Sequence, residues 1–192
     1  QKGGVEVTDD DWLYSVTYFN RLESISQDGL VPNAPEAVGR GAYRSHSAGR
    51  VFLTHCDGVF FWYSRYQDHA DDRSDDVLDE GLVPVVLRLP RTSVPHELHE
   101  DPDGLRDARH PAWFVEGEIS PDEIEVWTGV KWASVSDWEE IDPRSAMNSE
   151  EDPDEPGREL HYWKNSEPLR PRCGTRPNIG PSSDPFAHFA AR

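Results

Sequence analysis

Two glutamates separated by one glycine are the strongest candidates for chemistry in this chain of 192 residues. Glu116 and Glu118 fall within residues 113–119, whose aromatic and β-branched side chains predict a β-strand. Because residues two apart on a strand face the same side, the two carboxylates would project side by side. Close carboxylates repel and take separate roles, one stabilising a developing cation while the other activates a nucleophile. On a solvent-facing strand the same pattern is ordinary polar alternation, so two interpretations stay open.

Residues 39–50 form the one basic, glycine-punctuated stretch of an acidic chain. Asp and Glu number 37 against 19 Lys and Arg, which gives a formal net charge of −18. The three arginines of the stretch and its glycine N–H groups are suited to holding a pyrophosphate against this overall charge. The spacings of the common phosphate-binding glycine motifs do not occur in the sequence, and an exposed surface loop is the alternative interpretation.

Two further clusters contain side chains that bind metals or act as nucleophiles. Residues 96–101 are dense in His, Glu and Asp but lack the HExxH spacing, so we expect a polar loop and no metal ligands. His55 and Cys56 are adjacent and would point to opposite faces of a strand, which makes them a poor base–nucleophile pair. The other cysteine, Cys173, is distant in sequence, and two cysteines are not the density of a disulfide-stapled domain.

The elements that must position these residues are short strands and few helices. Strands are expected over residues 12–17, 50–54, 82–89, 113–119, 123–127 and 131–135. Helices are expected over residues 21–27 and 58–64, the second capped by Asp57. Pro84 indicates an edge strand or the start of a strand. Poor alternation of strands and helices favours an α+β fold with a mainly antiparallel or mixed sheet.

The chain divides by composition into three parts. We expect an N-terminal extension over residues 1–10, a folded domain over 11–140 and an acidic, proline-rich tail over 141–192, with residues 150–156 as a linker or disordered stretch. Residues 68–80 hold seven acidic side chains and are expected to form a solvated loop or helix face, with a cation site as the alternative.

The charge and the apolar runs bear on partners and location. An acidic surface repels phosphate backbones and anionic lipids, which disfavours nucleic-acid and membrane binding. The longest apolar run, residues 59–63, is too short to span a bilayer. No signal peptide is visible, so a cytoplasmic protein is expected, with a delivered effector as the alternative.

Several short motifs occur in an order that resembles ADP-ribosyltransferase-fold domains. Leu13-Tyr14-Ser15-Val16-Thr17 and then Ile25-(three residues)-Gly29-Leu30 resemble the opening of that group, L-Y-[HR]-x-T followed by I-x-x-x-G-L. The later segments resemble its second conserved strand (49–54), its aromatic-bearing helix (60–66), its next core strand (82–89) and its late strand with a catalytic glutamate (116–124). The resemblance covers roughly residues 11–128.

This resemblance implies an ADP-ribosyltransferase-like sheet core and transfer of ADP-ribose from NAD to a macromolecular acceptor, expected to be a protein, with release of nicotinamide. Glu118 would stabilise the oxocarbenium-like ribose and grip a ribose hydroxyl, and Glu116 would orient or deprotonate the acceptor. Arg44 and Arg50 would hold the pyrophosphate, and Tyr63 or Tyr66 would stack on nicotinamide. The remaining residues expected to bind NAD are Tyr14, Ser15, Thr17 and Tyr43.

The sequence departs from the family at one position. The family usually places His or Arg after the first-strand tyrosine, where this chain has Ser15, whose hydroxyl can bond a ribose but supplies no charge. Either Arg21 or Arg44 substitutes for that residue, or the chain is an atypical member, or the fold has lost NAD chemistry.

Three alternatives to this activity remain. An RNA 2′-phosphotransferase has a related fold and also uses NAD, but it relies on several basic residues, and the charge of −18 argues against a nucleic-acid substrate. A non-catalytic acidic binding or inhibitor protein would use that charge to steer a cationic target. A halophilic origin would explain the acidic surface without any functional meaning.

Overall fold

The computed structural model describes residue 7 and residues 11–32, 48–71, 79–101, 111–143, 147–151 and 159–163. The strands are β1 (Trp12–Tyr18), β2 (Val51–Thr54), β3 (Pro84–Pro90), β4 (His99–Glu100), β5 (Ala112–Val115), β6 (Glu125–Trp127), β7 (Trp132–Ser134), β8 (Met147–Glu151) and β9 (Glu159–Trp163). The α-helices are α1 (Leu22–Asp28) and α3 (Val59–Asp71). Short 3-10 helices are η1 (Phe19–Arg21), η2 (Cys56–Gly58), η3 (Arg91–Ser93), η5 (Pro121–Glu123) and η6 (Val135–Glu140).

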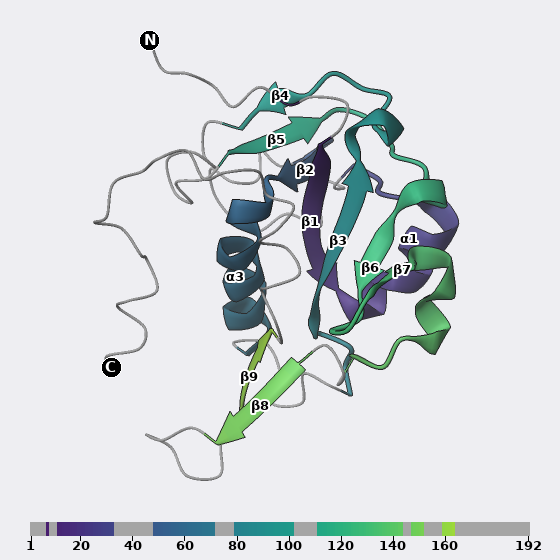
Figure 1. Cartoon of the computed structure of the whole chain (residues 1–192). Helices are drawn as coiled ribbons and strands as arrows, with labels where there is room; N and C mark the ends of the chain where they lie inside the picture. Colours follow the sequence, from purple (N-terminus) through teal and green to yellow (C-terminus); the bar gives the residue numbers. More distant parts are fainter. Residues whose placement is uncertain are drawn as a thin grey trace, which may run out of the picture.

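A seven-stranded antiparallel sheet, in the order β4-β5-β2-β1-β3-β6-β7, forms the centre of the molecule (Figure 1). β1 pairs with β3 along its whole length, from Trp12 opposite Pro90 to Tyr18 opposite Pro84. In contrast, β1 and β2 share a single registered pair. The sheet therefore consists of a three-stranded and a four-stranded half that meet at a narrow seam. The expected α+β class with few helices is confirmed.

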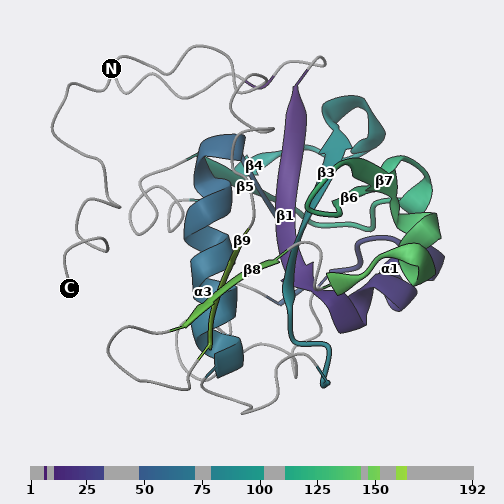
Figure 2. The ribbon, with the colours of Figure 1, turned by 60° about the horizontal axis from the view of Figure 1, so that its bottom comes forward.

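Alternation along β1 divides the core into two layers. Leu13 faces the larger cluster, where it packs with Leu87 and with Leu22 of α1. Tyr14 faces the smaller cluster, where it packs with Val59 of α3. Figures 1 and 2 show the consequence, because α3 lies against the sheet at one side and α1 lies beside the 3-10 turns at the other. None of the helices that the structure describes is long and apolar enough to cross a membrane.

Gly29 ends α1, and the chain after it runs beside Ile119, which follows β5. Its φ of +77° is unfavourable for residues with a side chain, and its N–H donates to the Ile25 carbonyl at 2.8 Å. A methyl group at this position would overlap the Ile119 carbonyl. The next residue, Leu30, forms an isolated antiparallel bridge with Ile119 through two hydrogen bonds of 2.9 Å. The glycine predicted as a helix stop is therefore also required for this close approach.

Several predicted boundaries are wrong. β5 ends at Val115, four residues before the predicted end, and the strand predicted to start at Glu123 starts at Glu125, because Glu123 belongs to η5. Pro84 begins β3, as one alternative proposed, but β3 lies between β1 and β6 and is not an edge strand. Part of the predicted polar loop is the two-residue strand β4, which depends on its pairing with β5. The predicted linker begins with Glu150 and Glu151, which lie in β8 and pair with β9.

Candidate functional site

The three residues 116–118 form a bend held between two buried anchors. Val115, the last residue of β5, and Ile119 are each 0% exposed, and Ile119 is hydrogen-bonded to Leu30. The glutamates of the bend are exposed. Because the strand does not continue past Val115, the expectation that both carboxylates project from one strand face is wrong. They extend instead from a short turn whose ends are fixed by packing.

The side chain of Glu116 lies beside Arg50, the residue that precedes β2. Val51 pairs with Val115, which brings Arg50 beside the start of the bend. The Arg50 Nε lies 3.7 Å from Glu116 Oε1, with side chains 26% and 61% exposed respectively. The guanidinium also lies over the Phe114 ring, with its central carbon 3.9 Å from the ring centroid. Two predicted site residues that are distant in sequence are therefore in contact.

Three neighbouring rings, on β2, β5 and β4, lie next to the contact between Arg50 and Glu116. Phe114 pairs with Phe52 on one side and with His99 on the other. The Phe52 and Phe114 centroids are 6.1 Å apart, and the His99 ring stacks on Phe114 at 5.2 Å with an interplanar angle of 27°. An arginine and a histidine thus gather at one phenylalanine in a strongly acidic molecule.

The backbone of the bend is held by His96. Its Nε2 lies 2.8 Å from the Glu118 carbonyl oxygen. A carbonyl oxygen can only accept a hydrogen bond, so Nε2 carries the hydrogen. The same imidazole lies directly against Gly117, where an added methyl group would overlap the ring. Sequence reasoning missed His96 as a partner of the two glutamates, because only the fold brings residues 96 and 118 together.

The other predicted NAD-binding residues do not gather at the bend. Tyr14 is buried in the smaller core cluster. Ser15 and Thr17 lie on the opposite face of β1, and the Ser15 hydroxyl donates to the Phe52 carbonyl at 3.3 Å. Tyr43 and Arg44 lie outside the described residues.

The two tyrosines predicted to stack on nicotinamide belong to the packing between α3 and the sheet. Tyr63 is 3% exposed, and burial raises the pKa of its hydroxyl. The Tyr66 ring lies 4.9 Å from that of Tyr18, whose hydroxyl donates to the Tyr66 carbonyl at 2.9 Å. Burial also raises the pKa of Tyr66, although the charge of Arg21 opposes that rise. Tyr63 therefore presents almost no ring surface to a ligand.

A second cluster, which sequence reasoning missed, centres on Arg88 of β3. This residue is 5% exposed, and its guanidinium carbon lies 4.1 Å from the Trp12 ring centroid and 4.3 Å from that of Trp132. Its Nε donates to Glu125, and its Nη1 has no hydrogen-bond partner among the residues that the structure describes. The signal in the sequence was a single charged residue in the otherwise apolar stretch 82–90.

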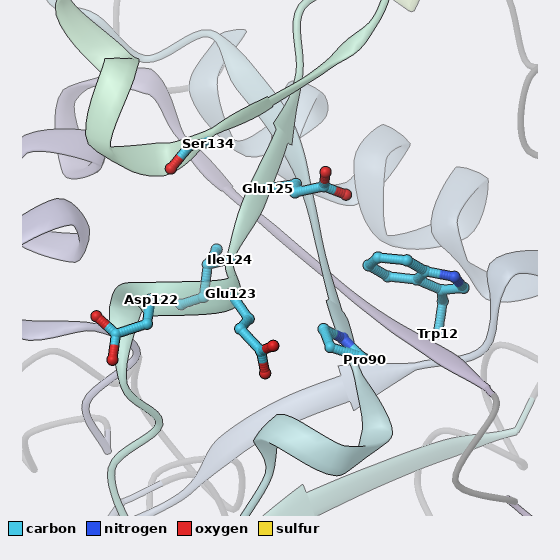
Figure 3. A pocket seen from close by; sticks show the side chains of 7 residues that line it. All are labelled: Trp12, Pro90, Asp122, Glu123, Ile124, Glu125 and Ser134. Atoms are coloured by element: carbon cyan, nitrogen blue, oxygen red, sulfur yellow. The ribbon is translucent and has the colours of Figure 1, made fainter.

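A pocket of about 300 Å³ lies next to this cluster (Figure 3). It is lined by Trp12, Pro90, Asp122, Glu123, Ile124, Glu125 and Ser134. Figure 3 shows its three carboxylates pointing in different directions, and two of them are already bonded, Asp122 by Ser120 and Glu125 by Arg88. Ligand sites have polar groups that converge on the ligand, which is not the case in this pocket. It contains none of the predicted site residues.

Two further candidates, the cysteine at position 56 and a metal site, are tested by the described residues. Cys56 is buried and disulfide-bonded, so its sulfur is not a free nucleophile for His55, whose Nδ1 lies 3.4 Å away. Sequence reasoning did not anticipate this bond. Within the described residues, no three His, Cys, Asp or Glu side chains come together as a metal site. No family model, curated protein or solved structure matches the chain.

Proposed function

We propose that the protein is an NAD-dependent ADP-ribosyltransferase whose reactive groups lie on the bend 116–118. The contact between Arg50 and Glu116 carries the proposal. Each was expected at an NAD site for its own chemical reason, Arg50 for the pyrophosphate and Glu116 for the acceptor. The order of β1, α1, β2, α3 and β3 along the chain agrees with the order of motifs in the resemblance.

The reaction needs a carboxylate where positive charge develops. Breaking the bond between ribose and nicotinamide leaves an oxocarbenium-like ribose, and a fixed carboxylate stabilises it without reorganising during the reaction. Glu118 takes this role, because both ends of its bend are anchored and its carbonyl is hydrogen-bonded. The nicotinamide leaves with the electron pair of the broken bond, and an acceptor nucleophile then attacks the ribose carbon.

The contact between Arg50 and Glu116 is weak enough to be exchanged when NAD binds. It is 3.7 Å long and the carboxylate is 61% exposed, so the ion pair is worth at most about 1 kcal/mol. A phosphate group offers the guanidinium shorter, charge-assisted hydrogen bonds. Binding of the pyrophosphate would release Glu116 to orient or deprotonate the acceptor.

Replacement of Glu118 by glutamine tests the proposal, since glutamine keeps the size of the side chain and removes its charge. We expect nicotinamide release from NAD to fall by about 10²- to 10³-fold. Glu123→Gln is the matched control, because Glu123 is an exposed glutamate on η5 and not part of the bend. Equal release by both variants would reject the role of Glu118, and no NAD binding by the native protein would reject the enzyme.

A non-catalytic binding protein is the second candidate, supported by the net charge of −18. Such a charge accelerates the capture of a cationic partner by long-range attraction. The two candidates separate in the same experiment, because a binding protein of this kind would neither bind NAD nor release nicotinamide.

A further inference from the structure

We infer that His96 is a positioning residue that holds the bend 116–118 through the Glu118 carbonyl, an inference that rests on the proposed function. The imidazole does not need to touch a substrate for this role. Its Nε2 donates to the Glu118 oxygen at 2.8 Å, and its ring occupies the space beside Gly117. His96 therefore contacts two of the three residues of the bend.

His96 is itself held firmly by the segment between β3 and β4. Two residues earlier, Val94 is 3% exposed in the larger core cluster, and two residues later Leu98 packs against the same cluster. The Arg91 side chain donates from Nη1 to the Val94 carbonyl at 2.8 Å, and the Ser93 hydroxyl donates to the Pro90 carbonyl at 2.7 Å. The backbone on both sides of His96 is therefore fixed by packing, and this limits where its imidazole can lie.

Gly117 fits this arrangement for a steric reason. Its φ does not lie in the left-handed region, so an alanine would meet no backbone strain there. The three described atoms nearest to an added methyl group, at 2.3, 2.4 and 2.8 Å, all belong to the His96 ring. The ring could move aside only by giving up its hydrogen bond to Glu118. A side chain at position 117 and the His96 contact therefore exclude each other.

Loss of His96 would leave the Glu118 peptide free to rotate between its two anchors. The backbone from which the Glu118 side chain extends would then no longer be held at one position. Misplacement of a reacting group by about 1 Å can lower the rate by about 100-fold without weakening substrate binding equally. The expected signature is a fall in kcat with little change in the KM for NAD.

The first test compares His96→Ala with His96→Gln in the full-length protein, with nicotinamide release as the readout. We expect the alanine variant to lose about 10- to 100-fold in kcat with KM changed less than about 3-fold. The glutamine amide can donate to the same carbonyl, so we expect it to restore most of the loss. His69→Ala is the control, because His69 is an exposed histidine on α3. Equal loss in both His96 variants, or no loss in either, would overturn the inference.

The second test does not depend on activity and uses the urea unfolding midpoint. We expect Gly117→Ala to lower the midpoint in the native background and to leave it unchanged in the His96→Ala background. An equal fall in both backgrounds would show that His96 does not occupy the space beside the bend. If the native protein releases no nicotinamide, the proposed function fails. The comparison of Gly117→Ala in the two backgrounds still decides whether His96 holds the bend.

Discussion

The guanidinium of Arg88 lies over two indole rings, and the residue is almost completely buried. Each ring contributes a cation–π contact, worth about 0.5 to 2 kcal/mol depending on desolvation. Glu125 supplies the countercharge from the neighbouring strand β6. The planar shape of arginine is essential to this arrangement, because a flat cation can stack on both rings at once.

Replacement of Arg88 by lysine should therefore destabilise the protein although the charge is kept. We expect a loss of about 2 kcal/mol in the free energy of unfolding, measured by urea denaturation, because the ammonium cannot stack on two rings while bonding Glu125. Arg65→Lys is the matched control, since Arg65 is exposed on α3, and it should change the value by less than about 0.5 kcal/mol. Equal losses in both variants would contradict the packing role.

At the candidate site, single residues are more readily proposed from sequence than the backbone that carries them. Glu116, Glu118 and Arg50 stand out by their chemistry in the sequence alone. The bend between the glutamates was not predictable from local composition, because aromatic and β-branched neighbours favour a strand through this stretch. The strand stops because the chain turns to meet Leu30 and to pass beneath His96, and both contacts come from distant parts of the sequence.

At the scale of elements, the packing of α3 against β1 depends on buried tyrosines. Tyr63 is 3% exposed, and burial raises the pKa of its hydroxyl. The neutral phenol therefore contributes stability that is fully present below about pH 10, the ordinary pKa of tyrosine. Above that pH the unfolded chain releases the proton first, so stability falls as the pH rises.

Tyr63→Phe should weaken this alkaline sensitivity. We expect the native urea midpoint to fall between about pH 9 and pH 11, and the fall to be smaller in the variant. The variant measured at neutral pH supplies the reference, since it reports any change in packing without a change in ionisation. The same alkaline fall in both proteins would show that Tyr63 does not titrate on unfolding.

Elements with a strong local pattern were predicted well, and elements defined by their partners were not. β1, α1, β2 and β3 follow from residue type and from stop signals such as Gly29. β4 has two residues, and nothing in His99-Glu100 predicts a strand until β5 lies beside it. β8 contains Glu150 and Glu151, whose acidic side chains have low strand propensity, and pairing with β9 overrides that preference.

At the scale of the whole molecule, the net charge of −18 opposes compactness. Like charges repel more weakly once ions screen them, and the screening length is about 10 Å at 0.1 M salt. We expect the thermal midpoint to rise as NaCl increases from about 0.02 M to 0.3 M, measured by circular dichroism. KCl at equal concentrations should give the same rise, because screening depends on ionic strength and not on the cation. A midpoint that stays level or falls would contradict a repulsive surface.

The two halves of the sheet meet only where β1 and β2 pair. One registered pair and the hydrogen bond from the Ser15 hydroxyl link the two halves there. A second link lies away from the seam, where Leu30, which follows β1 and α1, is bonded to Ile119 beyond β5. Glu118 is the residue next to Ile119, so the two halves of the sheet are joined a second time directly beside the candidate carboxylate.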